Sequence, residues 1–228
     1  MSTRKPGHGA KQRIYGQFAR ISKALAAPAR LELLDLLIQG ERSVDALATA
    51  TALSVANASQ HLQVLAAARL VDSRRDGQRV IYRIADDSVI ALWHALRRTA
   101  EMRLEELDEV ARDYLIGRDD FEAIDRAELA RRLRNGSVTL IDVRPAEEFA
   151  QAHIAGAISV PLAELPEFAK TVAKSQKVVA YCRGPYCVYA LQAVAALRKR
   201  GIQAVRVEDG VAEWRAAGLP IEVGGGAS

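Results

Sequence analysis

The two cysteines of the chain bracket one short segment, Cys182 to Cys187. A mainly apolar run, residues 177–181, reads as a short buried strand before the segment, and apolar residues at helical spacing follow it. A cysteine between a strand and a helix lies where backbone N–H groups, the helix N-terminus and the adjacent Arg183 favour the thiolate. The sequence therefore predicts that Cys182 is ionised, accessible and able to accept a sulfur atom or an oxidant. The expected loop around the thiols consists of Arg183, Gly184, Pro185, Tyr186 and Val188.

The second thiol, Cys187, has two interpretations. It is either a small buried apolar residue at the start of the helix, or a partner that attacks a persulfide on Cys182 to form a disulfide or polysulfide bridge. A pair of cysteines this close in a cytosolic protein is typical of redox or catalytic chemistry. We expect no cofactor and no metal.

Composition and charge exclude several classes of protein. The chain has 228 residues, enough for two domains, and its 50% apolar and 26% charged residues are typical of a soluble globular protein. The net charge of +4 is weak evidence for nucleic-acid binding, although residues 1–30 hold basic side chains and no acid. No apolar run approaches the ~20 residues that span a bilayer, so we expect a cytoplasmic protein without membrane contact.

The N-terminal half has mainly helical patterning around one hairpin. Residues 1–13 are expected to be irregular. Ser43 and Ser54 are expected to cap two helices, and Asp76-Gly77 predicts the turn of the hairpin. The expected helices are residues 14–25, a helix from Pro28 to about 39, 44–50, 55–68 and a long final helix 89–114; the expected strands are 70–75 and 79–84.

Beyond a polar boundary at residues 117–120, short strands alternate with helices. This order predicts a parallel sheet covered by helices. The expected helices are residues 126–134, 146–151, 165–172 and 188–200, and the expected strands are 139–143, 158–160, 177–181 and 204–207. We therefore expect two domains, a mainly-α winged helix-turn-helix over residues 1–116 and a small α/β domain over 117–228.

The helix that follows Ser54 is the candidate DNA-reading helix. Short polar side chains at the start of such a helix can reach base edges in the major groove, and a basic hairpin can contact phosphate. The candidate DNA-binding residues are Ser54, Val55, Ala56, Asn57, Ser59, Gln60 and His61 on the helix and Arg74, Arg75 and Arg79 on the hairpin.

The N-terminal half resembles the ArsR-type winged-helix repressors. The resemblance covers about residues 18–113 and rests on ALAAPARL (24–31), LS (53–54), QHLQVL (60–65) and GQRVIYR (77–83). It implies a homodimer, joined through its first and last helices, that binds an inverted-repeat operator and releases it on a signal. Many members of that family bind metals through cysteines before the DNA-reading helix. Here those positions are Arg42-Ser43-Val44-Asp45, which argues against metal sensing.

The C-terminal half resembles the rhodanese domain over about residues 121–223. The resemblance rests on LIDVR (140–144), EF (148–149), HIAGA (153–157), VP (160–161), the cysteine loop, GVAEW (210–214) and GLP (218–220). It implies that Cys182 carries sulfane sulfur as a persulfide. Asp142 and Arg144 would support the site structurally, with Arg144 an alternative contact for an anion. The arginine that many rhodaneses place five residues after the nucleophile is Cys187 here, and Val188 occupies the position where related phosphatases need arginine.

Three functions remain open from the sequence. The first is a DNA-binding regulator whose rhodanese domain senses sulfane sulfur from thiosulfate, polysulfide or a small persulfide through Cys182. The second is a weak sulfurtransferase that moves sulfur from such a donor to a thiol. A third alternative is a redox switch in which peroxide joins the two cysteines directly.

Overall fold

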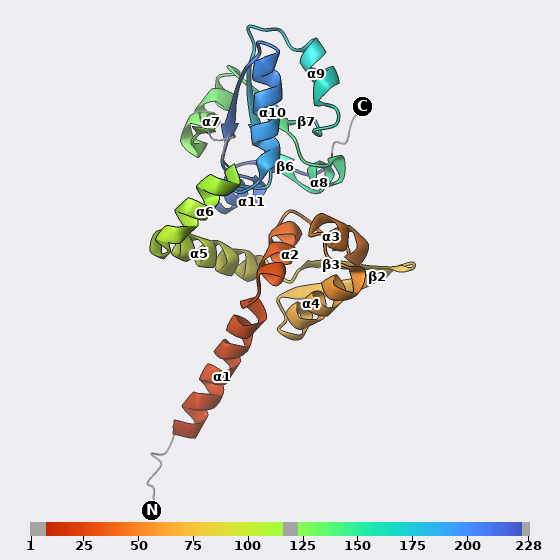
Figure 1. The fold of residues 1–228 in the computed structure, drawn as a ribbon, viewed down its shortest axis with the longest axis vertical. Coiled ribbons are helices and arrows are strands. Elements are labelled where there is room, and N and C mark those ends of the chain that lie inside the picture. Colours follow the sequence, from red (N-terminus) through yellow and green to blue (C-terminus); the bar gives the residue numbers. More distant parts are fainter. Residues whose placement is uncertain (1–7, 116–122, 225–228) are drawn as a thin grey trace, which may run out of the picture. The chain divides into compact units, whose positions relative to one another are not determined.

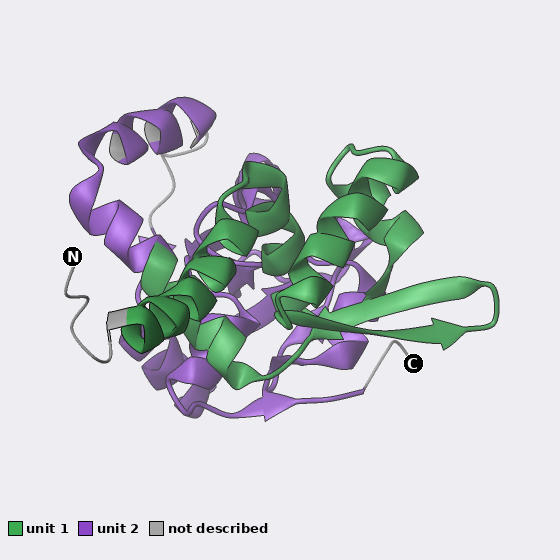
Figure 2. Ribbon diagram, turned by 90° about the horizontal axis from the view of Figure 1, so that it is seen from below, with its two compact units in different colours: residues 1–96 green, residues 97–228 purple. Residues whose placement is uncertain are grey.

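The computed structural model describes residues 8–115 and 123–224. These residues form two compact units, one up to Leu96 and one from Arg97 onward (Figure 2). The division falls inside helix α5 (Asp87–Arg103), which is continuous across it. The sequence-predicted boundary at residues 117–120 lies outside the described residues.

The first unit is a helical bundle with a three-stranded antiparallel sheet in the order β1-β3-β2. Its core contains leucines with no exposed surface, among them Leu33, Leu47, Leu62 and Leu65. The unit comprises α1 (His8–Leu25), α2 (Pro28–Ile38), β1 (Arg42–Ser43), α3 (Val44–Ala50), α4 (Val55–Ala67), β2 (Val71–Asp76), β3 (Arg79–Ile84) and the first part of α5 (Figure 1).

Local sequence signals account for most boundaries in this unit. The hydroxyls of Ser43 and Ser54 each accept a backbone N–H three residues later at 3.2 Å, so both predicted N-caps are confirmed. Gly77 has a φ of +59° in the turn between β2 and β3, which confirms the predicted hairpin. The hairpin extends beyond the helices of its unit (Figure 2). These elements form a winged helix-turn-helix.

Two predicted boundaries in this half are wrong. Helix α1 begins at His8, so residues 8–13 are helical rather than irregular. The predicted single helix 89–114 is two helices, α5 and α6 (Glu105–Leu115), interrupted at Leu104. Arg103 ends α5 and Glu105 begins α6. The positive charge of Arg103 is favourable at the partially negative C-terminus of α5, and the negative charge of Glu105 is favourable at the partially positive N-terminus of α6.

The second unit is built on a five-stranded parallel sheet, which confirms the predicted sheet type. The strand order is β4-β9-β8-β5-β7, and β6 pairs with β10 in a separate antiparallel ladder. The strands are β4 (Ala123–Ile124), β5 (Thr139–Asp142), β6 (His153–Ile154), β7 (Ile158–Ser159), β8 (Lys177–Tyr181), β9 (Gln203–Val207) and β10 (Ile221–Glu222). The helices after α6 are α7 (Arg126–Arg134), α8 (Ala146–Gln151), α9 (Leu165–Thr171), α10 (Val188–Lys199) and α11 (Val211–Ala216).

Helices cover both faces of this sheet, and alternate residues of its strands face opposite sides (Figure 1). Ile141 and Val178 pack with α9 and α10, whereas Leu140 and Val179 pack with α7 and α11. Trp214 of α11 is buried, and its indole N–H donates to the Pro220 carbonyl at 3.0 Å. This arrangement places the carboxyl end of β8, and the loop that follows it, directly before α10.

Candidate functional site

Strand β8 and helix α10 hold the two ends of the cysteine loop. Side chains of β8 alternate, so Val178, Ala180 and the following Cys182 share the face that packs against α10. The Cys187 N–H donates to the Gly184 carbonyl at 3.1 Å and closes the turn before α10. Gly184 has a φ of +142°, which side chains other than glycine rarely adopt. The loop thus brings both thiols together at the carboxyl edge of the sheet.

Cys182 is a buried thiol. Its exposed fraction is 2%, and burial raises the pKa of the Cys182 thiol well above its ordinary value. Backbone N–H groups of Arg183 and Ala190 do hydrogen-bond to the sulfur, but burial and the neighbouring Cys187 outweigh them. The prediction that Cys182 is accessible is therefore wrong for this structure, because the residue faces the core between β8 and α10. The same burial disfavours its thiolate.

Cys187 is half-buried and lies at the N-cap of α10. A hydrogen bond from the Cys182 thiol lowers the pKa of Cys187 to about 7, and the backbone N–H groups of Arg183 and Tyr189 act in the same direction. Both cysteines are free thiols in the structure. Burial therefore disfavours the thiolate of Cys182, whereas the hydrogen bonds around Cys187 favour its thiolate.

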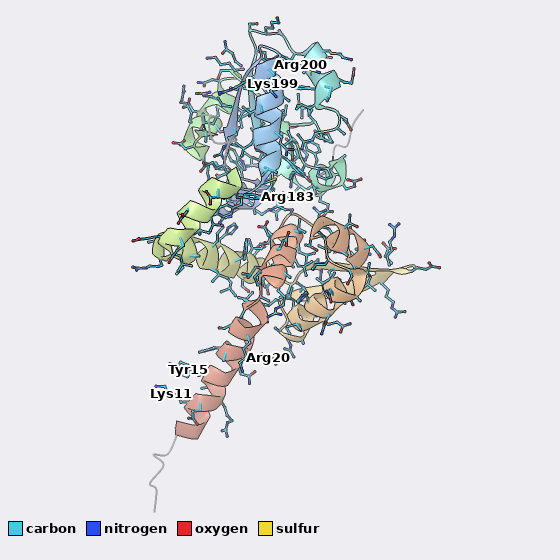
Figure 3. The ribbon with its side chains drawn as sticks, viewed as in Figure 1. Lys11, Tyr15, Arg20, Arg183, Lys199 and Arg200 are labelled. Atoms are coloured by element: carbon cyan, nitrogen blue, oxygen red, sulfur yellow. The ribbon has the colours of Figure 1, made fainter. Side chains whose placement is uncertain are left out.

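Arg183 forms an ion pair with a buried acid of α8. Its Nη2 lies 2.6 Å from Oε1 of Glu148, which is only 1% exposed, and its guanidinium stacks 5.2 Å from the Tyr189 ring centroid. Burial opposes the charge, yet the contact with Glu148 raises the pKa of Arg183 above its ordinary value. Arg183 lies at the opposite end of α10 from Lys199 and Arg200 (Figure 3). Its charge is thus balanced by Glu148 within the unit, which argues against a role for Arg183 in binding an anionic donor.

Asp142 and Arg144 form a fully buried ion pair at the end of β5. Nη2 of Arg144 lies 2.6 Å from Oδ2 of Asp142 and 2.7 Å from the Ala152 carbonyl oxygen, and neither charged side chain is exposed. The Tyr181 hydroxyl also hydrogen-bonds to Asp142 and accepts the Ile154 N–H at 3.1 Å. Of the two roles predicted for this pair, the geometry supports the structural one, because a buried, fully engaged guanidinium offers no face to an anion from solution.

Tyr186 connects the loop to the last residues of α5, which belong to the same unit. The Tyr186 hydroxyl donates to Oε1 of Glu101 at 2.9 Å. Arg97, one turn earlier, lies 2.8 Å from Oε1 of Glu213, whose other oxygen accepts the Gly210 N–H at 2.9 Å. The cysteine loop and the end of α5 are therefore joined by directed polar contacts.

The candidate DNA-reading side chains lie where the sequence predicts them, at the start of α4. Ala58 and Leu62 bury the inner face of the helix, which leaves the opposite face exposed. Ser54, Val55, Ala56, Asn57 and Gln60 are exposed, whereas Ser59 and His61 are half-buried. The contact of these residues with base edges stays a prediction.

The hairpin arginines differ in their ion pairing. Arg74 lies 2.5 Å from Glu41 and 3.4 Å from Asp76, so its charge is partly balanced within the unit. Arg75 and Arg79 are exposed, and within residues 8–115 and 123–224 the structure gives them no ion pair. Arg75 and Arg79 are therefore better placed than Arg74 to meet phosphate.

Sequence reasoning missed several residues that shape the thiol site. Glu148 and Glu213 are buried acids that pair with Arg183 and Arg97, and Gly210 lies against the backbone of the cysteine loop. Their partners lie far away in the sequence, so no local pattern predicts these pairs.

Comparison with known proteins agrees with this geometry. Residues 27–73 match the family model of bacterial regulatory proteins of the arsR family, and residues 125–217 match the rhodanese-like domain. An HTH-type transcriptional regulator of Mycobacterium tuberculosis, Rv0324, is 46% identical over 214 residues, which cover 94% of each chain. The chain belongs to the ArsR family of transcriptional regulators. Its C-terminal unit is a rhodanese-like domain, so both resemblances predicted from the sequence are confirmed.

Further relatives match one half of this ArsR–rhodanese protein. A sulfurtransferase of Allochromatium vinosum is 34% identical over 100 residues, 43% of this chain and 92% of that protein. A solution structure of a homodimeric winged helix-turn-helix domain from Mycobacterium bovis is 42% identical and covers 46% of this chain and 95% of that one, with a TM-score of 0.41. Within the described residues, no helix of this regulator is long and apolar enough to cross a membrane.

Proposed function

We propose that this ArsR–rhodanese protein is a cytoplasmic, dimeric transcriptional regulator that binds an inverted-repeat operator and responds to sulfane sulfur through Cys182 and Cys187. The observation that carries the proposal is the pair of hydrogen-bonded thiols in the rhodanese loop, one of them with a pKa of about 7. A thiol whose pKa lies near ambient pH is the best placed to attack a sulfur donor. The winged-helix unit supplies the surface for DNA.

Exposed apolar side chains support the dimer. On α1, Ile14, Tyr15 and Phe18 are 55%, 58% and 60% exposed, and on α5, Leu92 and Leu96 are each 38% exposed. A row of large apolar residues on a surface helix is typical of a protein interface. The first and last helices of the unit are also those through which the ArsR resemblance implies dimerisation.

The contacts of α5 offer a route from the thiols to DNA. Glu101 and Arg97 lie on α5 and contact Tyr186 and Glu213, while the first residues of the same helix belong to the winged-helix unit. A change in the loop that breaks these contacts would therefore act on a helix that the dimer uses. Such a coupling is typically worth ~1–3 kcal/mol, or about 5- to 150-fold in affinity.

Operator binding tests sulfur gating, which means that sulfane sulfur on the cysteine loop changes the affinity of the protein for its operator. The duplex that the wild-type protein selects from a random library is titrated before and after polysulfide treatment. We expect the affinity to change by roughly 5- to 150-fold in the wild type and to stay constant in Cys182→Ser. An unchanged wild-type affinity refutes gating, whichever cysteine reacts.

Arg79→Ala tests the role of the hairpin. If Arg79 neutralises a phosphate, its loss weakens binding to all sequences alike and reduces the slope of log affinity against log salt by about 1. Arg74→Ala is expected to change the slope less, because Glu41 already balances that charge. Lys174→Ala removes one exposed charge from the other unit and is the matched control. Equal slopes for Arg79→Ala and Lys174→Ala would contradict a phosphate contact.

A sulfurtransferase is the second candidate, favoured by the similarity of the C-terminal unit to a protein of that name. The ion pair between Arg183 and Glu148 argues against efficient capture of a dianionic donor such as thiosulfate. Steady-state turnover with cyanide as acceptor separates the two candidates. Retention of one bound sulfur without turnover supports the sensor and excludes the enzyme.

A further inference from the structure

The first half of α1 is exposed on all sides. Residues 9–20 are all exposed, and the helix joins the core of its unit only near Ala24, so it extends beyond α2, α3 and α4 (Figure 1). A helical segment of this length is marginally stable in water on its own, and Gly16 weakens it further. The exposed part of α1 therefore requires a second surface to stabilise it.

This exposed part of α1 is basic and has an apolar face. Ile14 and Phe18 lie one turn apart on the same face, and both are more than half exposed. Figure 3 shows Lys11 and Tyr15 on one side of the helix and Arg20 on the other. The helix has no acidic residue. A surface that fits α1 is therefore apolar at its centre and acidic at its edge.

Helix α6 has the opposite charge and a matching apolar face. Val110 and Tyr114 lie one turn apart and are 62% and 54% exposed. Glu106, Glu109 and Asp113 are exposed, and within residues 8–115 and 123–224 none of the three has an ion pair. Two copies of α1 repel each other, as do two copies of α6, whereas α1 attracts α6.

We propose that α1 of one copy packs antiparallel on α6 of a second copy of this chain. The contact rests on the proposed dimer and extends its interface beyond α1 and α5. Continuity with that interface selects a second copy as the occupant. Helix α5, whose exposed Leu92 and Leu96 belong to the proposed interface, ends at Arg103, and α6 begins at Glu105.

One register pairs the charges of the two helices. Arg13 and Arg20 are seven residues apart on α1, and Glu106 and Asp113 have the same spacing on α6. Residues at this spacing share one side of a helix. An antiparallel alignment sets Arg13 beside Asp113. Seven residues along, the same alignment sets Arg20 beside Glu106.

The same register interleaves the apolar side chains. Ile14 falls between Val110 and Tyr114, one turn apart on α6. Phe18 falls between Leu107 and Val110. Side chains of one helix that fit between those of its neighbour are the usual packing of two helices. The charges and the apolar faces therefore agree on one alignment.

Cross-linking of the full-length protein identifies the partner of α1. Ile14→Cys and Val110→Cys are introduced together in a Cys182→Ser, Cys187→Ser background and treated with a short bismaleimide. We expect a covalent dimer on a denaturing gel from this variant and none from either introduced cysteine alone. A cross-link that leaves the mass of a monomer would place α1 on α6 of its own copy. A dimer from Ile14→Cys alone would place α1 on α1, and either result overturns the proposal.

Charge reversal tests the register. Arg13→Glu is expected to raise the dissociation constant of the dimer roughly 5- to 30-fold at low salt, because the contact occurs twice in a dimer. Adding Asp113→Arg is expected to restore the constant to within about threefold of the wild type. This pair is chosen because Arg20 also donates to the Ala67 carbonyl of its own copy. Lys23→Glu makes the same change of charge on the opposite face of α1 and is the matched control.

Sedimentation equilibrium measures the dissociation constant. The register is wrong if Asp113→Arg fails to restore dimerisation, or if Lys23→Glu weakens the dimer as much as Arg13→Glu. A loss of operator affinity in Arg13→Glu with dimerisation unchanged would place α1 on DNA and overturn the contact. These results leave the proposed dimer and its response to sulfur standing. A monomeric wild type overturns the proposed dimer as well, so the two failures are distinguishable.

Discussion

Replacing Arg144 by methionine is expected to lower the free energy of unfolding of the rhodanese unit by about 3–5 kcal/mol. The guanidinium lies 2.6 Å from the Asp142 carboxylate, and neither side chain has any exposed surface. Without Arg144 the carboxylate keeps a backbone N–H and the Tyr181 hydroxyl, but its charge stays buried without a counter-charge. The Ala152 carbonyl also loses its donor. This loss is a large part of the ~5–15 kcal/mol that stabilises a typical domain.

Urea unfolding followed by the fluorescence of Trp214 measures this effect, in a Trp93→Phe background so that only the rhodanese unit is observed. The double variant Asp142→Leu with Arg144→Met is the control. It removes both charges and is expected to recover most of the lost stability, because an apolar pair of similar volume often replaces a buried ion pair without cost. A loss below about 1 kcal/mol in the single variant would show that the pair is not the structural anchor of the site.

Gly210→Ala is expected to displace the cysteine loop. A Cβ at this position would lie 2.6 Å from the carbonyl oxygen of Arg183 and 2.9 Å from that of Cys182, both backbone atoms that cannot rotate away. Such overpacking typically costs ~1–3 kcal/mol. A displacement of the thiols by about 1 Å can slow a reaction by ~100-fold. We therefore expect a moderate loss of stability together with a large loss in the rate of sulfur uptake.

Val211→Ala is the matched control for this steric effect. Val211 is the next residue, is 4% exposed and packs on the α11 side of the sheet, away from the thiols. Its truncation removes core contacts and lowers stability without pushing on the loop. The rate of sulfur uptake should stay near that of the wild type. If both variants slow uptake equally, the effect of Gly210→Ala comes from general destabilisation rather than from the loop.

Local features of this regulator were predictable because each depends on a few neighbouring residues. Ser43 and Ser54 cap helices through a hydrogen bond to a backbone N–H three residues away, and Gly77 forms its turn with adjacent residues. The alternation of strands and helices after residue 122 likewise predicts a parallel sheet. The interruption at Leu104 was not predicted, since no proline or glycine marks it.

The amino-acid sequence by itself determined the two-domain order, the winged helix, the parallel sheet and the presence of two thiols in a loop before a helix. Only the tertiary structure decided how far each thiol is buried, because the burial of Cys182 depends on how α10 packs over the sheet. It also decided that Arg183 forms its ion pair with Glu148, a residue 35 positions away, rather than with an anion from solution. Burial and ion pairing are set by segments that meet only in the folded chain, and side-chain pKa values follow them.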